Sequence, residues 1–224
     1  MTDALQLTSQ DPADTVAIGA AVASLCRGGD VVAMVGELGA GKTQFVRGLA
    51  RGLGLEPARV SSPTFVLMHE YEPAAPGGLT LVHIDAYRVA SLGDLESLGW
   101  DGDPDLRRGT VVAVEWADRL AEQMDAQALR VVIDHQGDTA RRVTLTAGSA
   151  WRDRWVTLAA AVDTYIEVAR TTPCPICRTP VAEGAATFPF CSPRCRTIDL
   201  GRWIDGRYAI TRPVEQSDLE EGVD

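Results

Sequence analysis

The stretch GELGAGKT, residues 36–43, contains the only lysine of this chain. It satisfies the phosphate-loop pattern G-x-x-x-x-G-K-[ST], with an apolar run before it and a helix-like segment after it. Its glycines let the backbone curl so that N–H groups point at an anion. Lys42 adds a compact charge on a flexible stem, which a planar guanidinium does not replace. We therefore expect nucleotide phosphates to bind here, with Lys42 on the β- and γ-phosphates and the Thr43 hydroxyl on Mg²⁺.

Four of the five cysteines form a second group of residues whose types and spacing could carry chemistry. They are spaced C-x₂-C, a gap of 13 residues, then C-x₃-C. Two close pairs of thiolates suit one tetrahedral Zn²⁺, and four protein ligands leave no position open for catalysis. Free thiols or a redox pair are the alternative. The predicted zinc ligands are Cys174, Cys177, Cys191 and Cys195, whereas the lone Cys26 is expected to be a small buried hydrophobe.

Acidic residues end two apolar strand-like runs. Asp85 ends LTLVHID and Glu115 ends TVVAVE. Strand ends of this kind can meet beside a phosphate loop, where such acids serve a bound metal. Ordinary surface acids at strand ends are the alternative. We expect His83 to be a strand histidine satisfied by the backbone, and we assign no role to the other two histidines.

Composition narrows the class of protein. A hydrophobic content of 46% and a mean hydropathy of −0.02 are typical of a globular chain. The net charge of −10 argues against nonspecific attraction to nucleic acid or to anionic membrane. AIGAAVASL is too short for a membrane span and follows acidic residues, so we expect no signal peptide, no membrane segment and a cytoplasmic location.

Secondary structure must place these residues. Asp11 and Pro12 are start signals for a helix over residues 11–26, and DVVAMV (30–35) reads as a buried parallel strand. A helix over TQFVRGLARGLG follows the loop and is closed by Gly54. Two strand-like runs around PAAPGG suggest a hairpin. Further strands are expected at residues 109–116, 129–135 and 141–148.

The predicted fold class is α/β, with a mixed sheet of the P-loop NTPase type flanked by helices and a small C-terminal zinc ribbon. Apolar residues recur at helical spacing over residues 150–170, which predicts a helix that packs on the first domain. The predicted domains are a P-loop ATPase domain at 1–149, an amphipathic connecting helix at 150–170, a four-cysteine zinc-binding module at 171–212 and an acidic disordered tail at 213–224.

Residues 1–150 resemble a bacterial ATPase family that supports threonylcarbamoyladenosine formation on tRNA, known as TsaE. The motifs that carry the resemblance follow one another in the family's order: GELGAGKT, SPTF (62–65), HIDAYR (83–88), LESLG (95–99) and VEW (114–116). Ala86 and Ala117 depart from the residues usual in that family, but neither touches the phosphate chemistry.

This resemblance implies ATP as ligand and slow hydrolysis that acts on a partner, the TsaD–TsaB complex, which modifies tRNA adenosine 37. The chain would then meet tRNA only indirectly. Thr43 and Glu115 would hold Mg²⁺, Asp85 would take a Walker-B-like position, and Thr64 would lie in a mobile switch segment near the γ-phosphate. The catalytic set implied is Lys42, Asp85, Glu115 and Thr64. The nucleotide-contacting set is Glu37, Leu38, Gly39, Ala40, Gly41, Lys42, Thr43 and Trp116.

The cysteine module resembles YacG, a zinc-binding family described as an inhibitor of DNA gyrase that binds the GyrB subunit. CPIC…FPFCSPRCRTIDLGRW carries this resemblance over residues 171–212. Arg178 stands where the family usually has glycine, in a turn that favours positive φ. We expect Ser192 to cap a helix that holds Cys195. Arginines 194, 196, 202 and 207 are read as one basic surface, either for an acidic partner or simply solvated.

Several functions fit these motifs. The leading hypothesis is an ATPase factor for tRNA modification fused to a zinc-binding module that binds gyrase. A phosphate loop also serves small-molecule kinases, so a kinase is the alternative enzyme. A nucleotide-gated gyrase regulator with no tRNA role is the alternative binding protein. An RNA-binding zinc ribbon is disfavoured, because the module has no lysine and we expect no interleaved exposed aromatic residues for base stacking.

Overall fold

The computed structural model describes residues 4–63, 66–89, 106–120, 126–169, 171–182 and 185–204. The chain divides into two compact units, residues 1–169 and residues 170–224. Within the described residues, no helix is long and apolar enough to cross a membrane.

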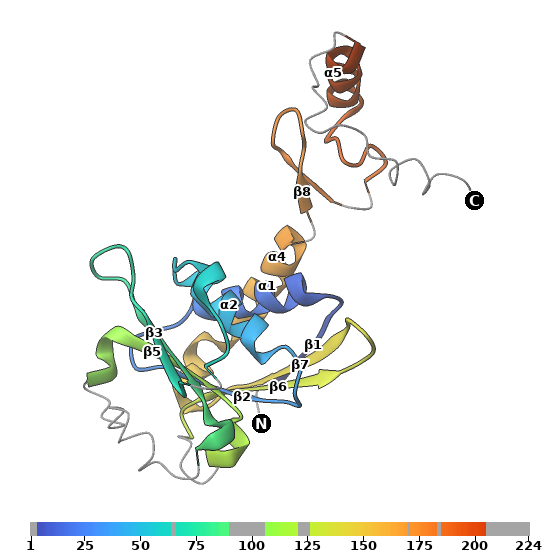
Figure 1. Ribbon diagram of the computed structural model, residues 1–224. Helices are drawn as coiled ribbons and strands as arrows, with labels where there is room; N and C mark the ends of the chain where they lie inside the picture. Colours follow the sequence, from blue (N-terminus) through green and yellow to red (C-terminus); the bar gives the residue numbers. More distant parts are fainter. Residues whose placement is uncertain are drawn as a thin grey trace, which may run out of the picture. The chain divides into compact units, whose positions relative to one another are not determined.

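A seven-stranded mixed sheet forms the frame of the first unit (Figure 1). Its strand order is β1-β7-β6-β2-β5-β4-β3, in which β6, β2, β5 and β4 are parallel while β1, β7 and β3 pair antiparallel with their neighbours. The strands are β1 (Ala4–Ser9), β2 (Val31–Val35), β3 (Met68–Tyr71), β4 (Thr80–Asp85), β5 (Thr110–Glu115), β6 (Leu129–His135) and β7 (Arg141–Thr146). The predicted mixed α/β fold is therefore confirmed.

Among the residues that the structure describes, three helices pack around the larger of the two hydrophobic cores of this unit. They are α1 (Pro12–Ala23), α2 (Lys42–Gly52) and α4 (Trp155–Ala169), the last preceded by the 3-10 helix η5 (Ser149–Arg154). Phe45, Leu49, Trp151 and Leu158 are fully buried together with the strand residues of this core. Burial of a side chain of this size stabilises the fold by roughly 1.5–3 kcal/mol.

Local signals explain where the helices begin. The Asp11 side chain accepts hydrogen bonds from the backbone N–H groups of Ala13 and Asp14, as an N-cap does. This helix ends at Ala23, three residues before the predicted end. Gly54, with φ of 75°, lies in the turn after α2, as predicted.

Helices α1 and α2 pack closely because each presents a glycine to the other. A Cβ on Gly48 would collide with the carbonyl oxygen of Val16 and with the Cα of Gly19. A Cβ on Gly19 would in turn collide with the carbonyl oxygen of Phe45. The phosphate loop leads directly into α2, so the packing of α2 on α1 also fixes the position of the residues at the end of the loop.

A smaller core lies among the strands around β4 and β5. It includes Ile84 and Val114, and it is joined by Ala86 and Leu120 from the 3-10 helices η2 (Ala86–Arg88) and η4 (Ala117–Leu120). Two further short 3-10 helices among the described residues are η1 (Pro57–Arg59) and η3 (Leu106–Gly109). Because η2 and η4 follow the strand ends directly, their packing holds Asp85 and Glu115 in place.

Strand β1 was not predicted from the sequence. Its residues ALQLTS alternate apolar and polar side chains, and Leu5 and Leu7 pack against the large core while the intervening Gln6 does not. This period of two is the pattern of a half-buried strand and could have predicted it. The predicted hairpin is confirmed, although β3 begins only at Met68.

In its described residues, the C-terminal unit combines a short hairpin with one helix. Strands β8 (Thr171–Pro173) and β9 (Pro180–Ala182) pair antiparallel, and α5 spans Pro193–Ile204. The Ser192 hydroxyl accepts a hydrogen bond from the Cys195 backbone N–H at 3.3 Å, which is the predicted cap. Residues 205–224, which include Arg207 and the predicted acidic tail, lie outside the described residues.

Candidate functional site

The phosphate loop connects β2 to α2 and owes its shape to glycine. Gly39 and Gly41 have φ of 77° and 108°, in the left-handed region that favours glycine. Gly36 has no room for a side chain, because a Cβ there would lie 2.5 Å from the carbonyl oxygen of Ile133. The buried strand and the glycines thus place the first turn of α2 at the end of the sheet.

Lys42 is buried and folded back over the loop. Its Nζ donates hydrogen bonds to the carbonyl oxygens of Gly36 and Glu37, at 2.7 and 2.9 Å. The same Nζ lies 3.7 Å from the centroid of the Trp116 ring. Burial lowers the pKa of Lys42, while the negative charges of Glu115, Asp85 and Asp118 oppose that shift. The ammonium is therefore held by weak partners that a phosphate could replace.

The two predicted acids meet at this loop. Strands β4 and β5 are parallel and in register, so Asp85 lies opposite Glu115. Both carboxylates are buried. Glu115 Oε1 accepts a hydrogen bond from Thr43 Oγ1 at 2.8 Å, which joins the strand end to the first turn of α2. These hydroxyl and carboxylate oxygens are hard donors of the kind that Mg²⁺ prefers, so the donor set fits this ion.

The prediction for His83 is wrong. Its ring is fully buried, and its Nε2 lies 2.9 Å from Glu115 Oε1 instead of bonding to the backbone. The reason is the strand register: side chains two residues apart on β4 point to the same face, so His83 and Asp85 both face the side on which Glu115 lies. The spacing H-x-D before a strand end was the available signal.

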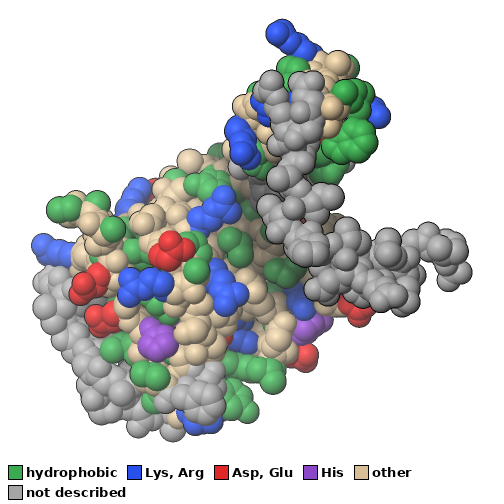
Figure 2. All heavy atoms as spheres, turned by 45° about the horizontal axis from the view of Figure 1, so that its top comes forward, with side chains coloured by type: hydrophobic (Ala, Val, Ile, Leu, Met, Phe, Trp, Pro, Cys, Tyr) green, Lys and Arg blue, Asp and Glu red, His purple; other side chains and the backbone are tan. Residues whose placement is uncertain are grey.

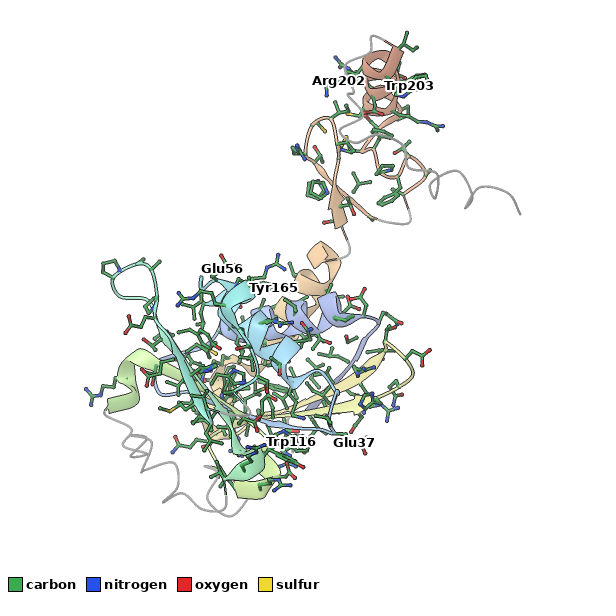
Figure 3. All side chains as sticks on the ribbon, in the orientation of Figure 1. Glu37, Glu56, Trp116, Tyr165, Arg202 and Trp203 are labelled. Atoms are coloured by element: carbon green, nitrogen blue, oxygen red, sulfur yellow. The ribbon has the colours of Figure 1, made fainter. Side chains whose placement is uncertain are left out.

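Aromatic side chains line one side of the site. Trp116 has a left-handed backbone, with φ of 59°, directly after β5. Its ring centroid lies 5.0 Å from that of Tyr87, and the Arg119 guanidinium lies 4.5 Å from the centroid of the Tyr87 ring. Figure 3 shows Trp116 and Glu37 at the same edge of the sheet.

These groups surround a pocket of about 590 Å³. Eight of the residues predicted to bind nucleotide or metal line this pocket. Seven of them come from the loop, from α2 and from the ends of β4 and β5, and the eighth, Trp116, follows β5. The predicted residues that line the pocket are Leu38, Gly39, Gly41, Lys42, Thr43, Asp85, Glu115 and Trp116. Gln44, Ser62 and Tyr87 line it too, and sequence analysis missed them. Thr64 lies outside the described residues.

The four clustered cysteines of the C-terminal unit converge. Their sulfur atoms all lie within 4.8 Å of one another, and the Cys177 and Cys191 sulfurs are 3.3 Å apart. Tetrahedral Zn–S bonds of about 2.3 Å require sulfurs about 3.8 Å apart, so the set fits zinc. Burial would raise the pKa of Cys174, but backbone hydrogen bonds from Cys177, Cys191 and Ile176 outweigh it and lower that pKa to about 6.

Backbone geometry supports this cluster. Arg178 has φ of 68°, so the turn does have the conformation for which glycine is usual. Its N–H donates to the Cys174 carbonyl oxygen at 2.9 Å. The turn therefore forms around a non-glycine residue, in a backbone region that side chains seldom occupy.

The surface of α5 differs from the predicted single basic face. Arg194 and Arg196 are two residues apart, which puts them on nearly opposite sides of a helix. Figure 2 shows the basic side chains of this unit dispersed around apolar ones, and Arg202 and Trp203 leave the helix on different sides (Figure 3). An exposed apolar stripe of Leu200, Trp203 and Ile204 is the feature that sequence analysis missed.

A phosphate loop that joins a central parallel strand to a helix, with acids at two neighbouring strand ends, defines a P-loop-like α/β protein that here carries a four-cysteine module. Comparison with known families agrees. The family model "Threonylcarbamoyl adenosine biosynthesis protein TsaE" matches residues 9–143, and the chain belongs to this family. The model "DNA gyrase inhibitor YacG" matches residues 172–221. Both resemblances noted from the sequence are thereby confirmed.

Individual relatives carry the same description. A protein of Streptomyces coelicolor is 42% identical over 147 residues, which are 65% of this chain and 96% of that protein. One of Bacillus subtilis is 40% identical over 144 residues, 64% of this chain and 85% of that protein. Both are described as tRNA threonylcarbamoyladenosine biosynthesis protein TsaE. The crystal structure of Bacillus subtilis YdiB aligns with a TM-score of 0.57 and 33% identity, over 74% of this chain and 97% of that one.

Proposed function

We propose that the first unit binds ATP with Mg²⁺, hydrolyses it slowly, and supports threonylcarbamoylation of tRNA adenosine 37 without itself transferring the carbamoyl group. The observation that carries this proposal is the 2.8 Å contact between Thr43 Oγ1 and Glu115 Oε1, beside Lys42. It brings two hard oxygen donors to the start of α2, where backbone N–H groups and the helix dipole favour phosphate. The description of the relatives supplies the pathway.

Each residue has a distinct task in this proposal. The N–H groups of the loop and of the first turn of α2 bind the β- and γ-phosphates. Lys42 exchanges the carbonyl oxygens of Gly36 and Glu37 for phosphate oxygens. The new hydrogen bonds are stronger, because both the donor and the acceptor are charged. Thr43 and Glu115 hold Mg²⁺, which when bound neutralises phosphate charge, and Asp85 adds negative charge from the neighbouring strand end.

The remaining site residues serve the nucleotide itself. Trp116 offers an aromatic face beside the phosphates, and Tyr87 supports that ring from 5.0 Å. Thr64 is proposed to approach the γ-phosphate. Ser62, two residues earlier in the chain, supports this proposal. Its hydroxyl donates a hydrogen bond to Asp85 Oδ2 at 3.4 Å, which brings this segment close to the end of β4.

The partner of this unit is proposed to be the TsaD–TsaB complex, so that tRNA is reached only through that complex. We propose a cytoplasmic location, since tRNA is modified there. In the C-terminal unit, one Zn²⁺ on four cysteines would be structural, because no coordination position is left open. Its exposed tryptophan and arginines are residue types enriched at protein interfaces, which supports binding to the GyrB subunit of gyrase.

The first test uses a bacterium depleted of its own TsaE. The full chain is expressed there, and threonylcarbamoyladenosine is quantified in digested tRNA by mass spectrometry. The wild type and Arg51→Ala, an exposed substitution on the same helix as the loop lysine, should restore the modification. Lys42→Ala should not. If the soluble wild type binds ATP but restores nothing, the tRNA role is lost, and a kinase or a nucleotide-gated gyrase regulator takes its place.

The gyrase proposal needs its own test. Purified wild-type chain should inhibit DNA supercoiling by gyrase, and Trp203→Ala should inhibit less. Val156→Ala is the matched control, since Val156 is an even more exposed apolar residue, at 83% against 69% for Trp203, but lies on α4 of the first unit. Equal inhibition by Trp203→Ala and wild type would remove the apolar stripe from the interface, and absence of inhibition by the wild type would end the gyrase proposal.

A further inference from the structure

Arg141, the first residue of β7, reaches across to the phosphate loop. Its Nε donates a hydrogen bond to the Ala40 carbonyl oxygen at 3.1 Å, and its Nη2 donates to that of Gly39 at 3.4 Å. Its Nη1 binds the carbonyl oxygens of Gly137, Asp138 and Ala140 in the turn between β6 and β7, at 3.3, 3.2 and 2.8 Å. One guanidinium thus ties the loop to the adjacent hairpin through five main-chain oxygens.

The contact with Ala40 fixes the direction of a phosphate-binding donor. The Ala40 carbonyl belongs to the same peptide group as the Gly41 N–H. A trans peptide is planar, so its N–H points away from its C=O. A guanidinium that holds the Ala40 oxygen on the outside of the loop therefore turns the Gly41 N–H inward, and Gly41 lines the pocket.

The contact with Gly39 acts differently. The N–H of its peptide group belongs to Ala40 and already donates to the Glu37 carbonyl oxygen at 3.2 Å. The N–H of the Gly39–Ala40 peptide is thus bonded within the loop, and Arg141 binds the carbonyl oxygen of the same peptide. This contact stabilises the loop, whereas the contact with Ala40 aims it.

The loop needs such an external anchor. Gly39 and Gly41 have positive φ, and glycine is the residue that loses most conformational freedom on ordering. Leu38 at the tip is 86% exposed, so its side chain adds little packing. Arg141, in contrast, is half-buried on a strand paired on both sides, with Ser9 on β1 and His135 on β6.

We infer that Arg141 is a positioning residue for the phosphate loop: it holds the Ala40–Gly41 peptide so that the Gly41 N–H faces the phosphates. This inference rests on the proposed nucleotide binding. A planar fork with several donors suits two segments of carbonyl oxygens at once, whereas a lysine at this position would supply one point charge.

The neighbouring arginine provides the matched control. Arg142 follows on the same strand, is exposed, and donates to the Gln136 side-chain oxygen at 2.8 Å, without contact to the loop. Affinity for Mg-ATP is measured by calorimetry for the full chain and for Arg141→Gln, Arg141→Lys and Arg142→Gln. We expect Arg141→Gln to weaken binding about tenfold, Arg141→Lys to fall between it and wild type, and Arg142→Gln to match wild type.

A second readout does not depend on ATP. The backbone amide signal of Gly41 is followed by NMR, and Arg141→Lys should shift it while Arg142→Gln leaves it in place. If the wild type binds no ATP, the proposed function fails, whereas the Gly41 signal still tests the anchor. If Arg141→Gln does not fold, Arg141→Lys decides both readouts. The inference is overturned if a folded Arg141 variant binds Mg-ATP with wild-type affinity. It is also overturned if the Gly41 signal stays in place in both Arg141→Gln and Arg141→Lys.

Discussion

The Nε2 of His83 lies 2.9 Å from Oε1 of Glu115, and the histidine is fully buried while the glutamate is nearly so. The same carboxylate oxygen accepts the Thr43 hydroxyl at 2.8 Å. Nδ1 of this ring has no hydrogen-bond partner among the described residues. Glu115 Oε1 thus receives two side-chain contacts, one from the first turn of α2 and one from β4, and together they hold the carboxylate in place.

Loss of that imidazole should be costly. His83→Leu fills the site with an apolar side chain but leaves the buried carboxylate without one donor, so we expect the free energy of unfolding to fall by about 1–3 kcal/mol. His83→Gln retains a donor and should cost less. Urea unfolding followed by circular dichroism measures both. Equal stability of the leucine variant and wild type would mean that the contact contributes nothing.

Removal of the Glu115 charge should impair metal-dependent chemistry more than folding. Glu115→Gln keeps the size of the side chain but replaces an anionic oxygen ligand, so we expect ATP hydrolysis to fall about 100-fold or more, a loss of the size seen when one charge-stabilising group is removed. Asp163→Asn, at an exposed acid on α4 that does not line the pocket, is the control and should retain activity. Phosphate release at several Mg²⁺ concentrations tests this, and full activity of Glu115→Gln would exclude it as a metal ligand.

Two arginine–aspartate pairs should differ sharply in what they contribute. Arg154 Nη2 and Asp30 Oδ1 are 2.6 Å apart and buried, and the Arg154 guanidinium also lies 4.0 Å from the Trp151 ring centroid. Arg154→Met leaves Asp30 without its cation, so the free energy of unfolding should fall by about 3–5 kcal/mol. The exposed pair of Arg27 with Asp153, at 2.8 Å, is screened by water, and Arg27→Ala should change stability little.

Chemical denaturation compares these two variants directly. Similar losses from both substitutions would show that burial does not govern these pairs.

Close packing of α1 on α2 makes Gly48 intolerant of a side chain. A Cβ there meets backbone atoms, which cannot move aside as a flexible side chain would. We expect Gly48→Ala to lower the free energy of unfolding by about 1–3 kcal/mol, as overpacking does. Gly109→Ala, at a position where a Cβ meets no atom within 4 Å, should be close to neutral. Thermal unfolding of both variants checks this, and a stable Gly48→Ala would show that the helices can separate without cost.

Removal of zinc should expose four thiols and leave the fifth protected. With zinc bound, none of the clustered cysteines should react with an alkylating agent at pH 8, and after chelation all four should react. Burial, reinforced by the charge of Asp30, raises the pKa of Cys26. A raised pKa keeps this thiol protonated at pH 8, so Cys26 should react only on unfolding.

Mass spectrometry counts the alkyl groups before and after chelation. Four modified cysteines without chelation would contradict metal binding, and modification of Cys26 in the folded chain would contradict the protection expected from its raised pKa.

The sequence by itself determined the pieces whose cause is local. The spacing of Gly36, Gly41 and Lys42 predicted the phosphate loop, and the apolar runs predicted most of the sheet. Both predictions were possible because loop conformation and the burial of a strand depend on residues that are neighbours in the chain. The cysteine spacing likewise predicted the cluster that the structure brings together. The alternation in residues 4–9 carried the same kind of signal but was overlooked.

Only the tertiary structure decided which distant groups meet. Register between β4 and β5 brings His83 to Glu115, and strand order brings Arg141 on β7 to the loop after β2. Gly19 and Gly48 matter only because α1 packs on α2. These relationships depend on pairing and packing between segments far apart in the chain. Spacing within one segment, such as H-x-D at the end of β4, shows that two side chains share a face but does not identify the distant residue that they meet.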